Sequence, residues 1–242
     1  PQGNTTSGLG IDKNSLEKTI YEVIGGELEI KEVIIEDLFE NLSLLPANRD
    51  LAGAEIELIT TENMQYIVKE KLSEVRDEYD YIILDMGAGI SEQSLQFIVS
   101  ANELIYITTP EPTAITDAYS MMKYLVSKTD APFYLLCNRA SSRKEGNEVI
   151  LRLSRAAQQF LHKEILALGI LPDDKTVQKA VIRQIPFILL NSLAPSSEAL
   201  NKIIAQYMGV MGKEGNPPVS FMKKMKNFLL IGRKKALKTK SV

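Results

Sequence analysis

Between residues 81 and 208, short apolar runs alternate with longer amphipathic segments, and this order constrains the fold more than any other feature. Strands are expected at 81–85, 104–108, 133–137 and 165–170. Helices are expected at 113–127, 145–161, 176–181 and 196–208. Parallel strands need long crossover connections, and when both faces are covered they read as continuous apolar runs. The alternation therefore predicts an α/β fold, with a doubly wound, mostly parallel sheet flanked by helices.

The first 80 residues are less regular. They predict helices at 15–24, 52–58 and 63–75, a short buried strand at 42–45, and a solvated acidic helix or loop at 27–37. Residues 209–218 have glycines or prolines at their two ends, which is typical of a linker. We therefore expect one domain over residues 1–208, a linker over 209–218 and a separate C-terminal tail over 219–242.

The bulk composition excludes several classes of protein. A chain of 242 residues with 45% apolar content can form one large α/β domain or two small ones. No apolar run approaches the roughly 18 residues of a transmembrane helix, and no secretory signal is visible. Cys137 is the only cysteine and His162 the only histidine. They form no disulfide framework or metal cluster, and the lone cysteine fits a reducing cytoplasm.

The opening segment PQGNTTSGLG raises the question of a phosphate-binding loop. Gly3 and Gly8 have the G-x-x-x-x-G spacing of such a loop. However, Leu9 and Gly10 stand where the loop needs lysine followed by serine or threonine. The spacing alone therefore does not predict a phosphate site.

The strongest local signal is YDYIILDMGAGIS, in which Asp85 ends an apolar run and Gly87 follows it. At the carboxyl edge of a parallel sheet, such an aspartate can hold Mg²⁺ beside nucleotide phosphates. The glycines allow backbone N–H groups to approach a phosphate closely. The alternative is an aspartate that caps the next helix, which would begin near Ser91. The pattern leaves both interpretations open.

A second signal is the pair Asn138 and Arg139, which follows the apolar run 133–137. An asparagine amide can pair with an adenine edge, and an arginine guanidinium can stack on a base. On spacing alone, a polar strand end that makes only loop contacts explains the pair better.

The C-terminal tail combines an apolar helical face with lysines. The apolar face consists of Phe221, Met222, Met225, Phe228 and Leu229, and the lysines off that face are Lys223, Lys224 and Lys226. Residues 221–242 hold eight basic residues and no acidic one, so the rest of the chain must carry −11 for the total to be −3. This pattern predicts a helix that lies on an anionic membrane surface. The alternatives are a helix packed on the body and a nucleic-acid contact, which is weaker because no aromatic platform accompanies the lysines.

These motifs resemble the ParA/MinD superfamily of P-loop ATPases with a deviant Walker A motif. Residues 1 to about 80, with PQGNTTSGLGI and LLPANRDLAGAEIEL, resemble the chromosome- and plasmid-partitioning branch. From about residue 79 to 242, the chain resembles the flagellar-number regulators, also called flagellum site-determining proteins. That part of the resemblance depends on YDYIILDMGAGIS, ITTPEPTAITDAYS, DDKTVQKAVIRQIPF and FMKKMKNFLL.

The resemblance implies ATP and Mg²⁺ as cofactors, and it assigns roles to individual residues. Asp85 would be the Walker B ligand of Mg²⁺, and Gly87 would belong to the second switch of the catalytic site. Asn138 and Arg139 would lie at the adenine, with Pro172 and Asp173 on the loop that closes over it. Residues 221–231 would be the membrane-targeting helix. PQGNTTSGLG resembles the first switch, so the phosphate loop is expected to precede Pro1.

The resemblance also implies partners and a location. The family forms ATP-dependent homodimers, and the tail would hold the protein on the inner face of the cell membrane as a peripheral cytoplasmic protein. A regulatory protein such as a flagellar GTPase would be a partner. The expected function is an ATP-dependent, membrane-associated switch that regulates flagellar number or placement. The alternatives are a partitioning ATPase that acts on DNA and a non-catalytic interaction module.

The family hydrolyses ATP to ADP and phosphate, but these 242 residues contain no Gly-Lys-Ser/Thr sequence. Each lost charge-assisted bond to phosphate costs about 1.5–3 kcal/mol. We therefore predict that the chain as given does not hydrolyse ATP.

Overall fold

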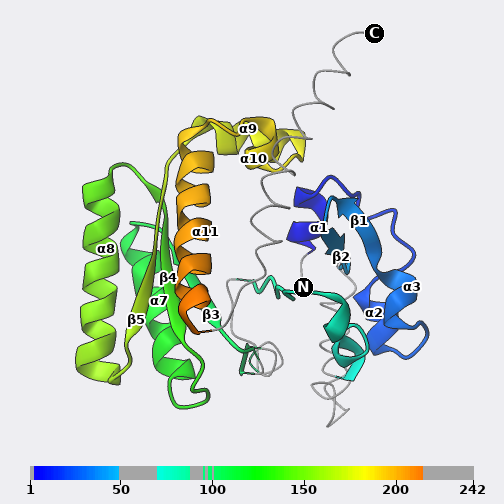
Figure 1. Ribbon diagram of the computed structural model, residues 1–242, viewed down its shortest axis with the longest axis horizontal. Coiled ribbons are helices and arrows are strands. Elements are labelled where there is room, and N and C mark those ends of the chain that lie inside the picture. The colour runs from blue at the N-terminus through cyan, green and yellow to red at the C-terminus, as the bar shows by residue number, and fades with distance from the viewer. Residues whose placement is uncertain (1–2, 49–69, 88–94, 96–97, 100, 215–242) are drawn as a thin grey trace. The chain divides into compact units, whose positions relative to one another are not determined.

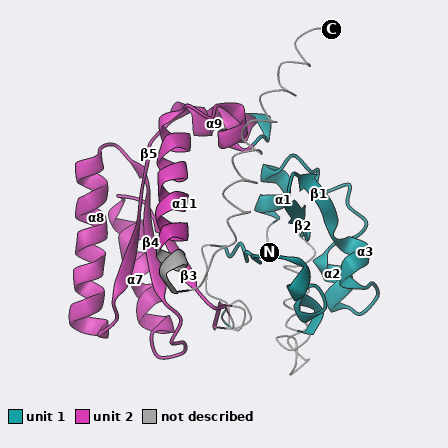
Figure 2. Ribbon diagram, in the orientation of Figure 1, with its two compact units in different colours: residues 1–97, 183–185 teal, residues 98–182, 186–242 magenta. Residues whose placement is uncertain are grey.

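The computed structural model describes residues 3–48, 70–87, 95, 98–99 and 101–214 (Figure 1). The chain forms two compact units, residues 1–97 with 183–185 and residues 98–182 with 186–242 (Figure 2). The sequence predicts one domain over residues 1–208, whereas the structure groups these residues into two units.

The second unit contains a parallel sheet in the order β3-β4-β5. The strands are β3 (Leu104–Thr108), β4 (Phe133–Ala140) and β5 (Ile165–Pro172). Helix α7 (Pro112–Leu125) connects β3 to β4, and α8 (Arg143–Ala156) connects β4 to β5 (Figure 1). This arrangement confirms the α/β fold with a parallel sheet flanked by helices.

Buried side chains on both faces of β4 explain why this strand reads as a continuous apolar run. Helices α7 and α8 pack against the sheet and bury Met122, Leu125, Val149 and Leu153. On the other face, Tyr134 and Leu136 of β4 cluster with Leu168 of β5 and Ile203 of α11 (Pro195–Glu214). Ile105 and Ile107 of β3 are paired with Tyr134 and Leu136 but are 53% and 63% exposed. Helix α11 therefore covers β4 and β5 on this face and leaves β3 open.

The first unit is built from short elements around a small core. The helices in its described residues include α1 (Asn4–Gly8), α2 (Ile20–Ile24) and α3 (Ile30–Val33). Strands β1 (Ile35–Phe39) and β2 (Leu42–Leu44) form an antiparallel pair. Val23, Ile30, Val33 and Val75 are each at most 3% exposed and form one cluster.

A capping box fixes where α2 begins. The Thr19 hydroxyl accepts a hydrogen bond from the Tyr21 N–H at 3.1 Å, and the Thr19 N–H donates to the Glu22 carboxylate at 2.7 Å. This reciprocal pair satisfies backbone donors that the first turn of a helix leaves free. The helix expected over 15–24 therefore begins only at Ile20.

Removal of this cap should loosen α2. We expect Thr19→Ala to lower the free energy of opening α2 by about 1 kcal/mol, the usual contribution of a threonine cap. Native-state hydrogen exchange at the Gly25 amide, which donates to the Tyr21 carbonyl at 2.9 Å, measures this opening. Glu17→Ala changes an exposed side chain two residues earlier and should leave that exchange unaltered. Equal exchange in both variants would contradict a stabilising cap.

The expected strand over 81–85 is wrong. Residues 81–87 form neither helix nor strand, and Ile83 is 87% exposed. A strand is stable only when its backbone groups pair with a neighbouring strand. Within the described part of the chain, this apolar run pairs with no strand, and apolar character alone does not supply those hydrogen bonds.

Other expectations differ mainly at their boundaries. The strand expected at 104–108 is confirmed, whereas β4 and β5 each run to a later residue than expected. Helix α8 is followed by a π-helical turn, Ala157–Leu161. The acidic segment 27–37 contains α3 and the start of β1. Helix α9 (Lys175–Arg183) lies where a short helix was expected at 176–181, and α10 (Phe187–Leu190) was not expected.

The predicted linker is partly helical. Helix α11 continues through Glu214, so it includes residues 209–214, which were expected to begin the linker. Residues 215–242, which include the tail, lie outside the described residues, as do 52–58 and 63–69. Among the helices that are described, none combines the length and apolar character needed to span a bilayer.

Candidate functional site

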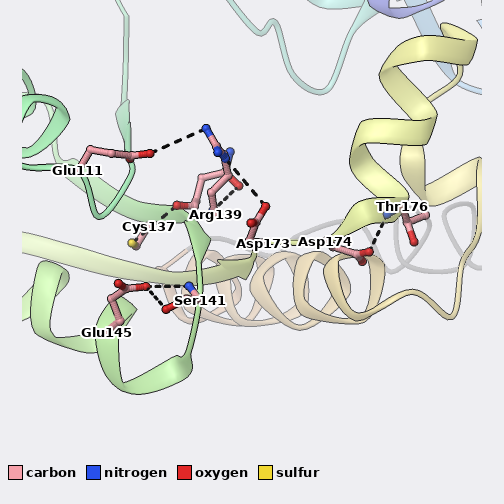
Figure 3. Close-up of polar contacts among 9 residues, drawn as sticks. Glu111, Cys137, Arg139, Ser141, Glu145, Asp173, Asp174 and Thr176 are labelled. Carbon is pink, nitrogen blue, oxygen red and sulfur yellow. Dashed lines mark hydrogen bonds and ion pairs between the residues drawn. The ribbon is translucent and has the colours of Figure 1, made fainter.

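Polar side chains from three chain segments meet at the carboxyl edge of the β3-β4-β5 sheet. Glu111 follows β3, Arg139 lies in β4, and Asp173 follows β5. The Arg139 guanidinium lies 3.9 Å from the Glu111 carboxylate and 4.0 Å from the Asp173 carboxylate (Figure 3). All three side chains are more than half exposed, so each ion pair contributes at most about 1 kcal/mol. Such pairs orient the guanidinium and leave it accessible to a ligand.

A bulge in β4 presents Asn138 and Arg139. Cys137 pairs with Ile170 and Ala140 pairs with Pro172, so two residues of β4 stand opposite one residue of β5. Arg139 has φ of 57°, and its N–H donates to the Asn138 side-chain oxygen at 2.9 Å. A bulge re-aims side chains and is common beside binding sites. The expectation that these residues lie just past the strand is corrected, because both lie inside β4.

The loop after the bulge is held by Glu145. Its carboxylate accepts hydrogen bonds from the Ser141 N–H and hydroxyl, both at 2.7 Å (Figure 3). These bonds lower the pKa of Glu145, the Ser141 hydroxyl being the larger cause. The Ser142 hydroxyl accepts from the Glu145 N–H at 3.2 Å and caps α8. These hydrogen bonds therefore hold the loop between β4 and α8 against the first turn of α8.

Pro172 and Asp173 lie at the end of β5. Pro172 is the last residue of the strand and pairs with Ala140, whereas the sequence placed it on a loop. The Asp173 N–H donates to the Ala140 carbonyl at 3.0 Å. Asn138, Arg139, Pro172 and Asp173 are therefore neighbours, although their predicted role at an adenine stays a prediction.

Asp85 lies in the first unit, where the opening segment contacts it. The Thr5 hydroxyl donates to the Asp85 carboxylate. The segment is held in turn by Thr6, whose hydroxyl donates to the Ala47 carbonyl and accepts from the Ala47 N–H, both at 3.1 Å. Gly3 has φ of 67°, and a Cβ there would lie 2.4 Å from the Ala47 carbonyl oxygen, so only glycine fits. Gly87 lies two residues beyond Asp85 in the same irregular stretch.

The donor set around Asp85 is small. No group of three or more histidine, cysteine, aspartate or glutamate side chains in the described ranges could hold a metal ion. Mg²⁺ in nucleotide sites often takes one or two carboxylates and completes its shell with phosphates and water. Asp85 and the Thr5 hydroxyl fit that pattern only where a nucleotide supplies further oxygens.

The remaining single candidates are not reactive groups. Cys137 is buried in β4, and burial raises the pKa of its thiol, so it is held as a neutral thiol. His162 is an exposed residue at the end of the π-helical turn. The tail residues expected at a membrane lie outside the described residues.

The sequence analysis did not single out three residues whose polar contacts the structure shows, namely Thr5, Glu111 and Asp174. Thr5 lies in a segment distant in sequence from Asp85, so no local pattern connects them. Glu111 lies shortly after the apolar run 104–108, just as Asn138 comes after the run 133–137, and that position in the sequence could have suggested it. Asp174 precedes Thr176 in the pattern of a helix cap, which was a usable signal.

Comparison with known proteins identifies relatives over different parts of the chain. A family model described as an AAA domain matches residues 1–131. The antiactivator FleN of Pseudomonas aeruginosa is 29% identical over 170 residues, which cover 69% of this chain and 59% of FleN. The flagellum site-determining protein YlxH of Helicobacter pylori is 29% identical over 197 residues, covering 80% of this chain and 63% of YlxH.

A third relative represents another branch. The sporulation initiation inhibitor Soj of Bacillus subtilis is 35% identical over 105 residues, covering 43% of this chain and 42% of Soj. The chain thus spans less than two thirds of the length of these relatives.

Solved structures share the fold. The septum site-determining protein MinD of Pyrococcus horikoshii, complexed with Mg-ADP, has a TM-score of 0.69 at 19% identity, covering 89% of this chain and 83% of that one. MinD of Aquifex aeolicus in complex with MinC has a TM-score of 0.63 at 22% identity, covering 85% and 78%. With a family model that matches more than half of its residues, and with these relatives and folds, the chain belongs to the ParA/MinD superfamily of ATPases.

Proposed function

We propose that the chain is part of an ATP-dependent switch that attaches peripherally to the inner face of the cell membrane and regulates flagellar number or placement. The observation that carries the nucleotide part is the meeting of Glu111, Arg139 and Asp173 at the carboxyl edge of the sheet. Open α/β sheets bind their ligands at this edge. The flagellar assignment is supported by YlxH, which matches 80% of the chain, whereas Soj matches 43%.

In this proposal the bulge in β4 receives the base. The Asn138 side-chain oxygen already accepts from the Arg139 N–H, so its amide N–H groups stay available to an acceptor on the base edge. The guanidinium of Arg139 is planar and 59% exposed, which suits stacking on a base. Pro172 and Asp173 border the same position from β5.

Asp85 would hold Mg²⁺ in this proposal, and Gly87 would let the chain move when the phosphate leaves. Mg²⁺ would neutralise charge that develops on the phosphates during transfer. The Thr5 hydroxyl orients the Asp85 carboxylate by donating to it. The residues described would thus supply orientation, and a lysine-bearing phosphate loop of the kind that the family resemblance implies would supply most of the phosphate binding.

The membrane part rests on the tail. Each buried apolar side chain contributes roughly 1.5–3 kcal/mol at best, and each lysine near an anionic surface about 1 kcal/mol. Ordering the helix offsets much of this, so a single tail should bind reversibly. Two tails in an ATP-dependent homodimer would bind far more tightly, because the second binds intramolecularly. A domain over 1–208, a connecting segment and a tail over 219–242 belong to the same proposal.

Two alternative functions would use the tail lysines and the sheet in different ways. A partitioning ATPase would use the lysines on DNA, and the match to Soj over 105 residues supports that reading. A non-catalytic interaction module would present the sheet and helices to a protein partner. The MinC complex of Aquifex aeolicus MinD is an example of protein binding by this fold. A regulatory protein, such as a flagellar GTPase, would be the partner of the proposed switch.

Vesicle binding tests the proposal. Phe228→Glu should weaken binding of residues 1–242 to phosphatidylglycerol vesicles about 10- to 100-fold, because it removes an apolar side chain worth roughly 1.5–3 kcal/mol. Asn227→Glu adds the same charge on the opposite face of the helix. It should weaken binding only about fivefold, the effect of one charge. Cosedimentation measures both affinities, with phosphatidylcholine vesicles as the uncharged reference.

Vesicle binding that Phe228→Glu leaves unaltered would contradict the membrane-surface helix. A wild-type chain that ignores anionic vesicles but binds double-stranded DNA would favour the partitioning alternative. A chain that binds neither surface but retains a protein partner would favour the interaction module.

A further inference from the structure

The Asp174 carboxylate joins the first turns of two helices. One oxygen accepts from the Thr176 N–H of α9 at 2.7 Å (Figure 3). The other accepts from the Ser196 N–H of α11 at 3.1 Å and from the Ser196 hydroxyl at 2.7 Å. Ser196 is 22 residues further along the chain and only 1% exposed. One side chain therefore serves helix ends that are not consecutive.

These bonds favour the ionised carboxylate. The Ser196 hydroxyl is the main cause and the Thr176 N–H the next, and together they lower the pKa of Asp174 to about 2. Asp174 thus carries a full negative charge at neutral pH, where it complements the positive ends of both helix dipoles.

Asp173, the residue before Asp174, contacts β4 and not the two helix ends. Asp173 faces the bulge in β4, where its carboxylate lies 4.0 Å from the Arg139 guanidinium (Figure 3). Its N–H is bonded to the Ala140 carbonyl. The two carboxylates belong to consecutive residues joined by one planar peptide unit. A shift of the Asp173 backbone is therefore passed directly to the backbone of Asp174.

Helix α11 can carry such a movement away from the sheet edge. It has 20 residues, which corresponds to a length of about 30 Å. Ile203 packs on Gly169 of β5, and the Tyr207 hydroxyl donates to Glu103 at 2.5 Å. The helix ends at Glu214, immediately before residues 215–242.

We propose that Asp174 is a positioning residue that couples the polar cluster at the sheet edge to α11, and through α11 to the C-terminal tail. The coupling to nucleotide and membrane rests on the proposed function, whereas the mechanical link does not. The bistable element is the Asp174–Ser196 contact, which is either made or broken. A ligand that draws Arg139 away from Asp173 changes the populations of the made and broken contact. The size of that change is set by the difference between the ligand's binding free energies for the two states.

Hydrogen exchange in residues 1–242 tests the link without nucleotide or membrane. Asp174→Asn should speed exchange of the Ser196 and Thr176 amides about tenfold, because both lose a charged acceptor. Asp173→Ala should speed exchange at Ser196 at least threefold in the wild-type background. It should have no further effect in the Asp174→Asn background, since the path between the two positions is already broken.

Two more variants separate coupling from general loss of stability. Ser142→Ala removes the cap of α8 in the same unit and should leave exchange at Ser196 and Thr176 unchanged. Ser196→Ala keeps Asp174 and removes one of its hydrogen-bond donors. It should therefore speed exchange of the Thr176 amide by a smaller factor than Asp174→Asn does. It serves as the second probe if Asp174→Asn fails to fold.

The proposal is overturned if Asp173→Ala leaves Ser196 unaffected in the wild type, or if it acts equally in the Asp174→Asn background. In a longer chain that binds ADP, Asp174→Asn should leave ADP affinity within about threefold. It should reduce the effect of ADP on binding to phosphatidylglycerol vesicles. A wild-type protein that binds neither ADP nor vesicles would refute the proposed function but not the exchange result.

Discussion

Joined to an upstream segment that carries a lysine-bearing phosphate loop, the chain should bind ATP about three to six orders of magnitude more tightly than residues 1–242 alone. Three charge-assisted hydrogen bonds to phosphate, each worth about 1.5–3 kcal/mol, account for a difference of this size. The 242 residues contain no Gly-Lys-Ser/Thr, so they lack the lysine of a phosphate loop that would make such bonds.

Titration with a fluorescent ATP analogue in Mg²⁺ measures the two affinities, and phosphate release measures turnover. Replacing the added lysine by alanine should return the affinity towards that of residues 1–242, which controls for added chain length. Asp85→Ala should remove Mg²⁺-dependent turnover from the longer chain. Mg²⁺-dependent hydrolysis by residues 1–242 that Asp85→Ala abolishes would refute the prediction of inactivity. A folded, partner-binding chain indifferent to the added loop would favour the interaction module.

Gly169→Val should lower the free energy of unfolding by about 3–5 kcal/mol. Gly169 has φ of 151°, where side chains are strained, and its added Cβ would lie 2.6 Å from Cγ1 of Ile203. Backbone strain costs about 1–3 kcal/mol and overpacking a similar amount. Ile203 belongs to the cluster with Tyr134, Leu136 and Leu168, so displacement of α11 would disturb the whole face.

Urea unfolding followed by circular dichroism measures this effect. Gly209→Ala is the matched control, because Gly209 lies in α11 with nothing within 4 Å of its added Cβ. That substitution should raise the free energy of unfolding by up to about 1 kcal/mol, since alanine favours a helix over glycine. Equal stability of Gly169→Val and the wild type would show that Ile203 of α11 does not pack closely on Gly169 of β5.

The sheet of the second unit was predictable because its signal is local and redundant. The run from Phe133 to Cys137 is completely buried, and helices of suitable length separate it from its neighbours. The run from Tyr81 to Asp85 has the same apolar character, yet it forms no strand in the described residues. Pairing is a property of two segments, and a single run does not reveal whether its partner is present.

The candidate site shows a similar division. The residue types Asn138, Arg139 and Asp173 were expected at the sheet edge, and the structure brings these three together. The bulge that aims the first two was not foreseen, because it depends on the register between β4 and β5. Thr5 and Asp85 are 80 residues apart, so their contact exists only in the folded chain.

By itself, the sequence determined the α/β class, the parallel β3-β4-β5 sheet, the superfamily and the residue types at the sheet edge. These features depend on the period of apolar residues and on contiguous motifs, which short stretches of chain carry. Only the tertiary structure decided that Arg139 lies between two carboxylates and that Asp174, at the start of α9, also bonds Ser196 of α11, 22 residues further along the chain. The physical reason is that the partners of a polar side chain are chosen by register and packing, which segments distant in sequence decide together.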